Sequence, residues 1–155
     1  SEVLYTPNLI LKRDEMNGHY SLLPTKKYCL VNILSASAPR VKGKQVDEHI
    51  LQEIFEKGIK NILLTPFSHN KEAWNNGRKK IIILGAWGCG AYGNDSSNVA
   101  KYFYNVLNNY HIKKLYDKLI FAVPETIGIS SDSNSANFIT LITKLNDLQV
   151  DTNLL

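Results

Sequence analysis

Hydrophobic residues near the start of the chain stand in short runs between polar residues, which is typical of strands. Residues 3–14 are expected to be extended, with an interruption at Pro7. The pair Asn17 and Gly18 is a strong signal for a two-residue turn, and residues 19–23 follow as a returning strand. We therefore predict a β-hairpin in this part of the chain.

Three further apolar runs predict buried strands, namely residues 28–34, 80–84 and 119–123. The run at 80–84 is uniformly apolar, so we expect a central strand that is covered on both faces. Small residues follow the first of these strands and end in Pro39 and Arg40, which predicts a thin-walled loop.

Helical spacing of apolar residues appears between these strands and after the last one. Residues 46–57 place Ile50, Leu51, Ile54 and Phe55 on one face, and Gly58 is predicted to end that helix. Further helices are expected up to about residue 77 with an interruption near Pro66, at about 96–109 and at 138–145, the last preceded by a loop at 130–137. Strands that alternate with helices predict an α/β fold with a mixed or parallel sheet between helices, in a single domain over 1–155.

Charge and cysteine content narrow the class of partner. The 155 residues include 18 Lys and Arg against 14 Asp and Glu, a formal net charge of +4 in scattered pairs. This favours an anionic small molecule over a nucleic-acid duplex. Two cysteines make neither a disulfide framework nor a zinc cluster, so we expect no metal, no cofactor and a cytoplasmic location. No apolar run approaches the length of a membrane span, so this segment is expected to make no membrane contact.

Residues 83–95, ILGAWGCGAYGND, hold four of the nine glycines and stand between a predicted strand and a predicted helix. Glycines let main-chain N–H groups approach a ligand without an intervening Cβ, and a helix N-terminus adds unpaired amides and positive charge. Together these features favour the binding of a phosphate or pyrophosphate. Asn94, Asp95 or Ser96 is the expected N-cap of the helix.

Two other interpretations of the glycines stay open. The loop could be a purely structural connection, whose glycines only allow tight turns of the backbone. Residues 88–93 also have the G-x-G-x-x-G spacing of a dinucleotide-binding loop, but the acidic residue expected about 20 positions further on is missing, because the next strand ends near Glu125. A P-loop is excluded, since no Gly-Lys-Ser/Thr follows.

The segment LGAWGCGAYGND, followed by VAKYFYNVL, resembles the signature of the bacterial-type poly(ADP-ribose) glycohydrolases, a branch of the macrodomain superfamily. Weaker matches stand in the same order, at LYTPNL with Lys12-Arg13-Asp14, at SASAPR and at FAV in residues 121–123. The resemblance covers residues 4 to 145 and implies a macrodomain-like fold, in a minimal or N-terminally truncated version.

The resemblance also implies a binding site for ADP-ribose. In this family the glycine loop surrounds the diphosphate, which here implies Gly85, Ala86, Trp87, Gly88, Cys89, Gly90, Ala91, Tyr92, Gly93 and Asn94. Tyr92 takes the aromatic place at the distal ribose, whereas Trp87 is either a wall of the pocket or part of the core. The rim or floor is implied for Ala36, Ser37, Ala38 and Pro39, and the adenosine end for Val123 and Pro124.

One departure from the family bears on catalysis. Family enzymes carry a glycine run and a Gln-Glu-Glu element, in which one glutamate is the general acid. This sequence contains no consecutive glycines and no adjacent glutamates, so no catalytic residue is assigned. We therefore expect a reader or sensor that binds ADP-ribose, a related nucleotide or ADP-ribosylated proteins. The alternatives are a glycohydrolase whose acid lies outside the recognised motif, and a scaffold without a ligand.

Overall fold

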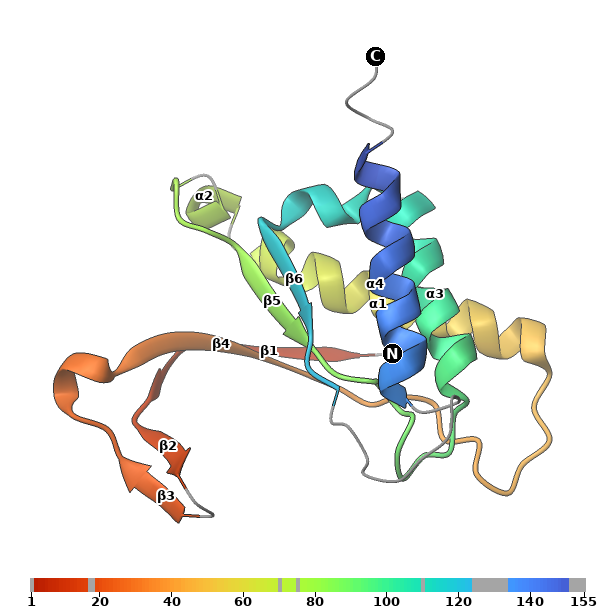
Figure 1. Cartoon of the computed structure of the whole chain (residues 1–155), viewed down its shortest axis with the longest axis horizontal. Helices are drawn as coiled ribbons and strands as arrows, with labels where there is room; N and C mark the ends of the chain where they lie inside the picture. Colours follow the sequence, from red (N-terminus) through yellow and green to blue (C-terminus); the bar gives the residue numbers. More distant parts are fainter. Residues whose placement is uncertain are drawn as a thin grey trace.

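The structure of the chain is a computed structural model, and it describes residues 2–16, 19–69, 71–74, 76–109, 111–123 and 134–150 (Figure 1). The strands are β1 (Val3–Leu11), β2 (Arg13–Met16), β3 (His19–Leu22), β4 (Cys29–Ala36), β5 (Ile81–Leu84) and β6 (Lys118–Phe121). The helices are α1 (Glu48–His69), α2 (Lys71–Trp74), α3 (Ser96–Asn109) and α4 (Asn134–Val150), with short 3-10 turns at Thr25–Lys27 and Ile112–Leu115. The predicted mixed α/β class is confirmed.

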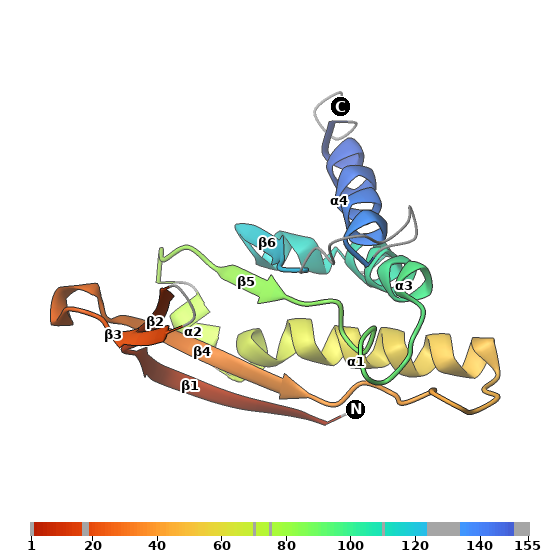
Figure 2. The same cartoon turned by 60° about the horizontal axis from the view of Figure 1, so that its bottom comes forward.

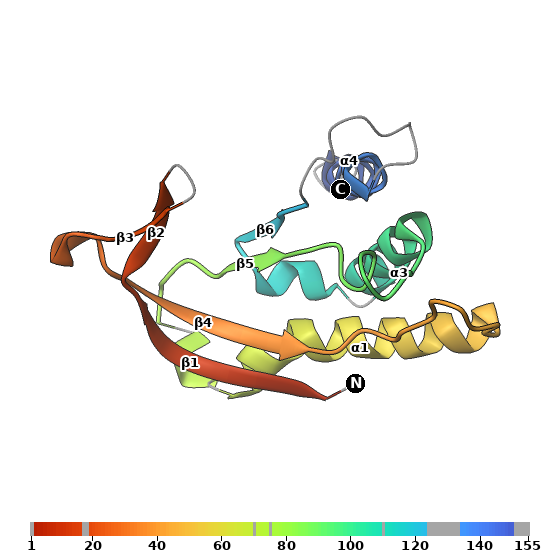
Figure 3. The same cartoon turned by 90° about the horizontal axis from the view of Figure 1, so that it is seen from below.

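The described strands form three pairs: antiparallel β1–β4, antiparallel β2–β3 and parallel β5–β6. Strands β2 and β3 confirm the predicted hairpin, whose turn residues 17 and 18 lie outside the described part. The hairpin projects away from α1, α3 and α4 in all three views (Figures 1–3). The β1–β4 register shifts between Thr6 and Leu9, where the sequence predicted an interruption at Pro7, because proline has no N–H for the ladder.

The predicted burial of β5 on both faces is wrong. Ile82 and Leu84 are buried, but Ile81 and Ile83 are 53% and 66% exposed. The apolar run indicated a strand correctly, but the described elements cover only one of its faces. Strand β4 was also predicted to be buried, and its Leu30 is 66% exposed for the same reason.

The core lies where α1, α3 and α4 pack together beside the strands (Figures 2 and 3). Its fully buried side chains come mainly from α1 and α3 and include Phe55, Ile59, Leu63, Val99, Phe103, Val106 and Leu107. Helix α4 adds Phe138 and Leu141, as its predicted apolar spacing indicated. The β1–β4 pair packs on α1 through Val3, Leu34 and Ala36.

Three predicted helix boundaries are wrong. Helix α1 does not end at Gly58 and is not interrupted at Pro66, but continues to His69. Gly58 is buried beside Phe55 and Ile59, so it is a packing position of the helix rather than its end. Residues 134–137 of the predicted loop 130–137 form the first turn of α4, and residues 130–133 lie outside the described part.

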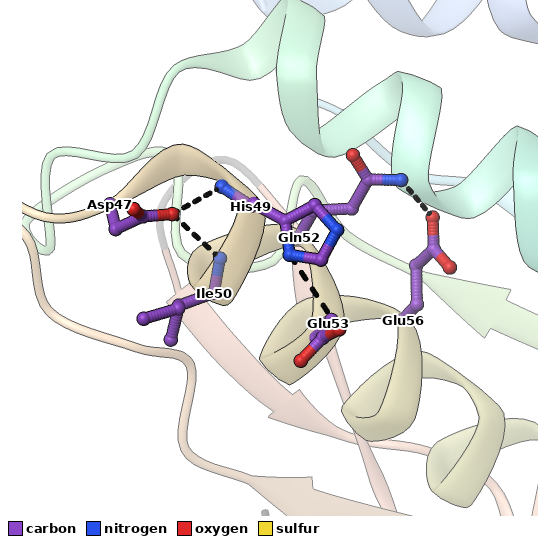
Figure 4. A network of polar contacts seen from close by, with 6 residues as sticks. All are labelled: Asp47, His49, Ile50, Gln52, Glu53 and Glu56. Atoms are coloured by element: carbon purple, nitrogen blue, oxygen red, sulfur yellow. Dashed lines mark hydrogen bonds and ion pairs between the residues drawn. The ribbon is translucent and has the colours of Figure 1, made fainter.

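The N-terminus of α1 is fixed by side chains (Figure 4). Asp47 Oδ1 accepts hydrogen bonds from the backbone N–H groups of His49, at 2.9 Å, and Ile50, at 3.1 Å. More than two turns further on, Glu56 Oε1 accepts from the side-chain amides of Gln52 and Asn105, both at 2.8 Å. Because Asn105 belongs to α3, Glu56 ties the two core helices together.

Replacing the cap tests this account of α1. Asp47→Ala removes the acceptor of two helix N–H groups, so we expect the free energy of unfolding to fall by about 1 kcal/mol. Asp47→Asn is the matched control, because asparagine caps helices about equally well. Both are measured by denaturant unfolding followed by circular dichroism, and equal stability of Asp47→Ala and the parent chain would contradict the assignment.

Candidate functional site

The glycine loop, residues 85–94, leaves the carboxyl end of β5 and leads into α3. Asp95 caps this helix, since its Oδ1 accepts from the N–H of Asn98 at 2.8 Å and its backbone oxygen accepts from Val99. Asp95 is one of the three predicted caps. The loop therefore lies beside the positive end of the α3 dipole.

Two glycines of the loop adopt backbone conformations that favour glycine. Gly88 has φ +83° and Gly93 has φ +73°. A Cβ on Gly88 would lie 2.7 Å from both Ala38 Cβ and Asn94 Nδ2, closer than real side chains approach. Gly90 differs, because a Cβ there would meet no protein atom within 4 Å. The loop thus has one glycine enclosed by protein and another that faces open space.

The backbone amides of the loop fall into two groups. The N–H groups of Cys89, Gly93 and Asn94 donate to loop carbonyls, at 3.1, 3.0 and 3.2 Å. Within the described residues, the N–H groups of 85–88 and 90–92 donate to no protein acceptor. The internal bonds fold the loop back on itself, and the remaining N–H groups have no hydrogen-bond partner among the described residues.

A second segment, residues 36–42, lies against the glycine loop. The Trp87 indole N–H donates to the carbonyl of Ala36 at 2.9 Å. The carbonyl of Tyr92 accepts from the N–H groups of Val41 and Lys42, both at 3.1 Å. The structure therefore brings the two main predicted parts of the site together, although they are far apart in sequence.

Asn94 joins the two segments. Its side chain is 6% exposed, and Nδ2 donates to the carbonyls of Pro39, at 2.7 Å, and Gly88, at 2.9 Å. Oδ1 is buried and accepts no hydrogen bond from the described residues. The sequence had placed Asn94 in the diphosphate loop or at the helix cap, but it did not show this clamping role.

Trp87 packs against the core. Its ring meets Phe55 edge-on, with centroids 5.3 Å apart, and its indole N–H is engaged by Ala36. Trp87 is half-buried and also lines a cleft of about 820 Å³, so both predicted roles, wall of a pocket or part of the core, stay open.

The other predicted residues differ in their exposure. Tyr92 is 38% exposed, Ser37 is exposed and Ala38 is buried against Gly88. Val123 is half-buried beside the core after β6, and Pro124 lies outside the described residues.

Cys89 is half-buried between Gly88 and Gly90. Burial, together with the negative charge of Asp95, raises the pKa of its thiol to about 11. The thiol is therefore protonated near neutral pH, and a protonated thiol is a poor nucleophile. Among the residues described, no group of three or more His, Cys, Asp or Glu could hold a metal ion. None of the described helices is long and apolar enough to cross a membrane.

Comparison with known proteins identifies the fold. No protein-family model and no characterised protein sequence matches the chain. The poly(ADP-ribose) glycohydrolase of Thermomonospora curvata superposes on 90% of this chain and 46% of its own, with a TM-score of 0.71 and 25% identity. The Deinococcus radiodurans enzyme, solved in complex with ADP-ribose, matches 92% of this chain and 53% of its own, with a TM-score of 0.63 and 25% identity.

The chain therefore has the macrodomain-like fold of bacterial poly(ADP-ribose) glycohydrolases, and the resemblance in its sequence is confirmed at the level of structure. It spans about half the length of these similar proteins.

The two kinds of glycine give a matched pair of substitutions. Gly88→Ala places a Cβ against Ala38 and Asn94 at a positive φ, so we expect a loss of about 1–3 kcal/mol in the free energy of unfolding. Gly90→Ala adds the same methyl group in open space and should change stability by less than about 0.5 kcal/mol. Denaturant unfolding measures both, and equal stabilities of the two variants would contradict the described loop geometry.

Proposed function

We propose that this chain binds ADP-ribose, or a nucleotide derived from it, through residues 85–94, and acts as a reader or sensor without efficient hydrolysis. The observation that carries the proposal is the set of unpaired N–H groups at 85–88 and 90–92 beside the N-terminus of α3. Backbone amides at a helix N-terminus are suited to a diphosphate, because they combine donors with positive charge.

The surroundings of the loop support a nucleotide rather than a bare anion. Segment 36–39 lies along one side of the loop, and Tyr92 offers a partly exposed ring to a ribose. Val123, which follows the end of β6, and Pro124 are assigned to the adenosine end. The Deinococcus radiodurans glycohydrolase, which shares the fold, was solved with ADP-ribose. Proteins that carry ADP-ribose are therefore proposed as partners.

Catalysis is less well supported than binding alone, because cleavage of a glycosidic bond needs a positioned acid. Asp95 is the carboxylate next to the loop in the chain, and its Oδ1 is engaged in capping α3. The alternative function, an ADP-ribosyl glycohydrolase whose acid lies outside the recognised motif, is favoured by one observation. The similar structures from both organisms are glycohydrolases.

Calorimetric titration with ADP-ribose tests binding. We expect saturable heat for the parent chain and a loss of binding in Gly90→Val, because the branched side chain would occupy the space assigned to the diphosphate. Gly90→Ala is the graded control and should weaken binding less than valine does. Circular dichroism establishes that the variants fold. The titration extends to about 1 mM ADP-ribose, and a Kd of that size corresponds to a binding free energy of about −4 kcal/mol. No heat with the parent chain up to this concentration would refute the proposal.

Release of ADP-ribose from a modified protein distinguishes the two functions. With automodified ADP-ribosylated protein as substrate, we expect residues 1–155 to release no ADP-ribose above the background rate. Steady release that is abolished by one carboxylate substitution, while ADP-ribose binding persists, would establish the glycohydrolase instead.

A further inference from the structure

A short basic turn follows the segment that is hydrogen-bonded to the glycine loop. Residues 41–44, VKGK, form a β-turn in which the N–H of Lys44 donates to the carbonyl of Val41 at 2.9 Å. Gly43 has φ +75°, which is the conformation that a type II turn requires at its third position and that favours glycine. The turn therefore holds the backbone of Lys42, its second residue, in a defined place.

The turn is attached to the loop through its first two residues. The N–H groups of Val41 and Lys42 both donate to the carbonyl of Tyr92, at 3.1 Å. The atoms nearest to a Cβ built on Gly93 are Lys42 Cβ, Cα and Cγ, at 3.0, 3.3 and 3.5 Å. The base of the Lys42 side chain therefore lies against Gly93, next to residues 90–92, whose N–H groups donate to no acceptor among the described residues.

The positive charges of this part of the chain are not balanced by acidic side chains. Residues 16–46 include five Lys and Arg and no Asp or Glu. Arg40, Lys42 and Lys44 are exposed, and none of them forms an ion pair with a carboxylate of the described residues. A lysine ammonium carries three donors on a flexible stem, so that of Lys42 is free to turn toward an anion at the loop.

The glycine loop itself supplies no positive side chain. Residues 85–95 contain no Lys, Arg or His, and their one charged residue is Asp95. The N-terminus of α3 contributes only a partial positive charge, equivalent to about half of an elementary charge. A diphosphate carries a negative charge on each phosphate, and hydrogen bonds from a full cation to such a group are stronger than those from neutral amides. A cation from a neighbouring segment would therefore complete the site.

We propose that Lys42 is a specificity-determining residue of the candidate site, and that its ammonium group donates to the diphosphate bound at the glycine loop. This inference rests on the proposed function and adds a side chain to a site otherwise made of backbone amides. The turn fixes the base of Lys42, and the exposed end of the side chain reaches the phosphates. The contact makes the site selective for charged nucleotides, and salt screens it.

Two substitutions in the same turn test the proposal. Lys42→Met and Lys44→Met each remove one positive charge and keep a flexible apolar side chain. ADP-ribose is titrated calorimetrically into the parent chain and both variants. We expect Lys42→Met to weaken binding at least about tenfold, because a charge-assisted hydrogen bond is lost, and Lys44→Met to weaken it less than about threefold. Equal weakening by the two would overturn the proposal, because the charges would then act only through the general field of the turn.

Arginine and salt distinguish a contact with the phosphates from a structural role of Lys42. Lys42→Arg keeps the positive charge and should keep the Kd within about threefold of the parent value. Added KCl should weaken binding by the parent chain more steeply than binding by Lys42→Met, because the variant has lost one of the charges that salt screens. A loss in Lys42→Arg as large as that in Lys42→Met, or the same salt dependence in parent and Lys42→Met, would overturn the proposal.

One further outcome would assign the contact to another residue. A loss of about tenfold in Arg40→Met, with none in Lys42→Met, would place the cation at Arg40 and overturn the proposal. These comparisons are made with a parent chain that binds ADP-ribose, so failure of the Lys42 proposal leaves the proposed function standing. Absence of binding by the parent chain would instead refute both.

Discussion

The hydrogen bonds from the Asn94 side chain hold the candidate site together. Nδ2 donates to Pro39, in the segment after β4, and to Gly88, in the loop after β5. Hydrogen bonds of a buried group are costly to lose, so this contact helps to fix the distance between the two loops, together with the bonds of Trp87 and Tyr92 to the same segment. It also explains why position 88 is a glycine, since any Cβ there would collide with the Asn94 amide. The open amides at 90–92 owe their positions to this arrangement.

The sequence predicted the order and type of most elements, because their hydrophobic spacing is strong. The hairpin, β5, α3 and the interruption at Pro7 all follow from local patterns. The boundary of α1 could not be predicted, because Gly58 and Pro66 are signals of a helix end that tertiary packing overrides. The exposure of Ile81 and Ile83 could not be predicted either, since an apolar strand looks the same whether or not a neighbour covers it.

The place of the site was predicted from its glycines and from a family resemblance. The different surroundings of the individual glycines were not predicted. Sequence alone treats the glycines of the loop as equivalent, but the structure separates Gly88, which is enclosed, from Gly90, which is open. It also packs the half-buried Trp87 against the core residue Phe55, and the raised pKa of the Cys89 thiol keeps it protonated near neutral pH. The two halves of the site lie together because β4 and β5 end at the same side of the molecule and lead directly into them.

The central claim is that the unpaired backbone amides of the glycine loop bind the diphosphate of ADP-ribose. The most direct measurement is a ¹H–¹⁵N NMR titration of residues 1–155 with ADP-ribose, which observes each backbone N–H separately. The account predicts that the largest shifts fall on Gly88, Gly90, Ala91 and Tyr92, with Gly93 and Asn94 shifting less because their N–H groups already have carbonyl partners. Saturable binding that leaves the resonances of residues 85–92 unmoved would contradict it.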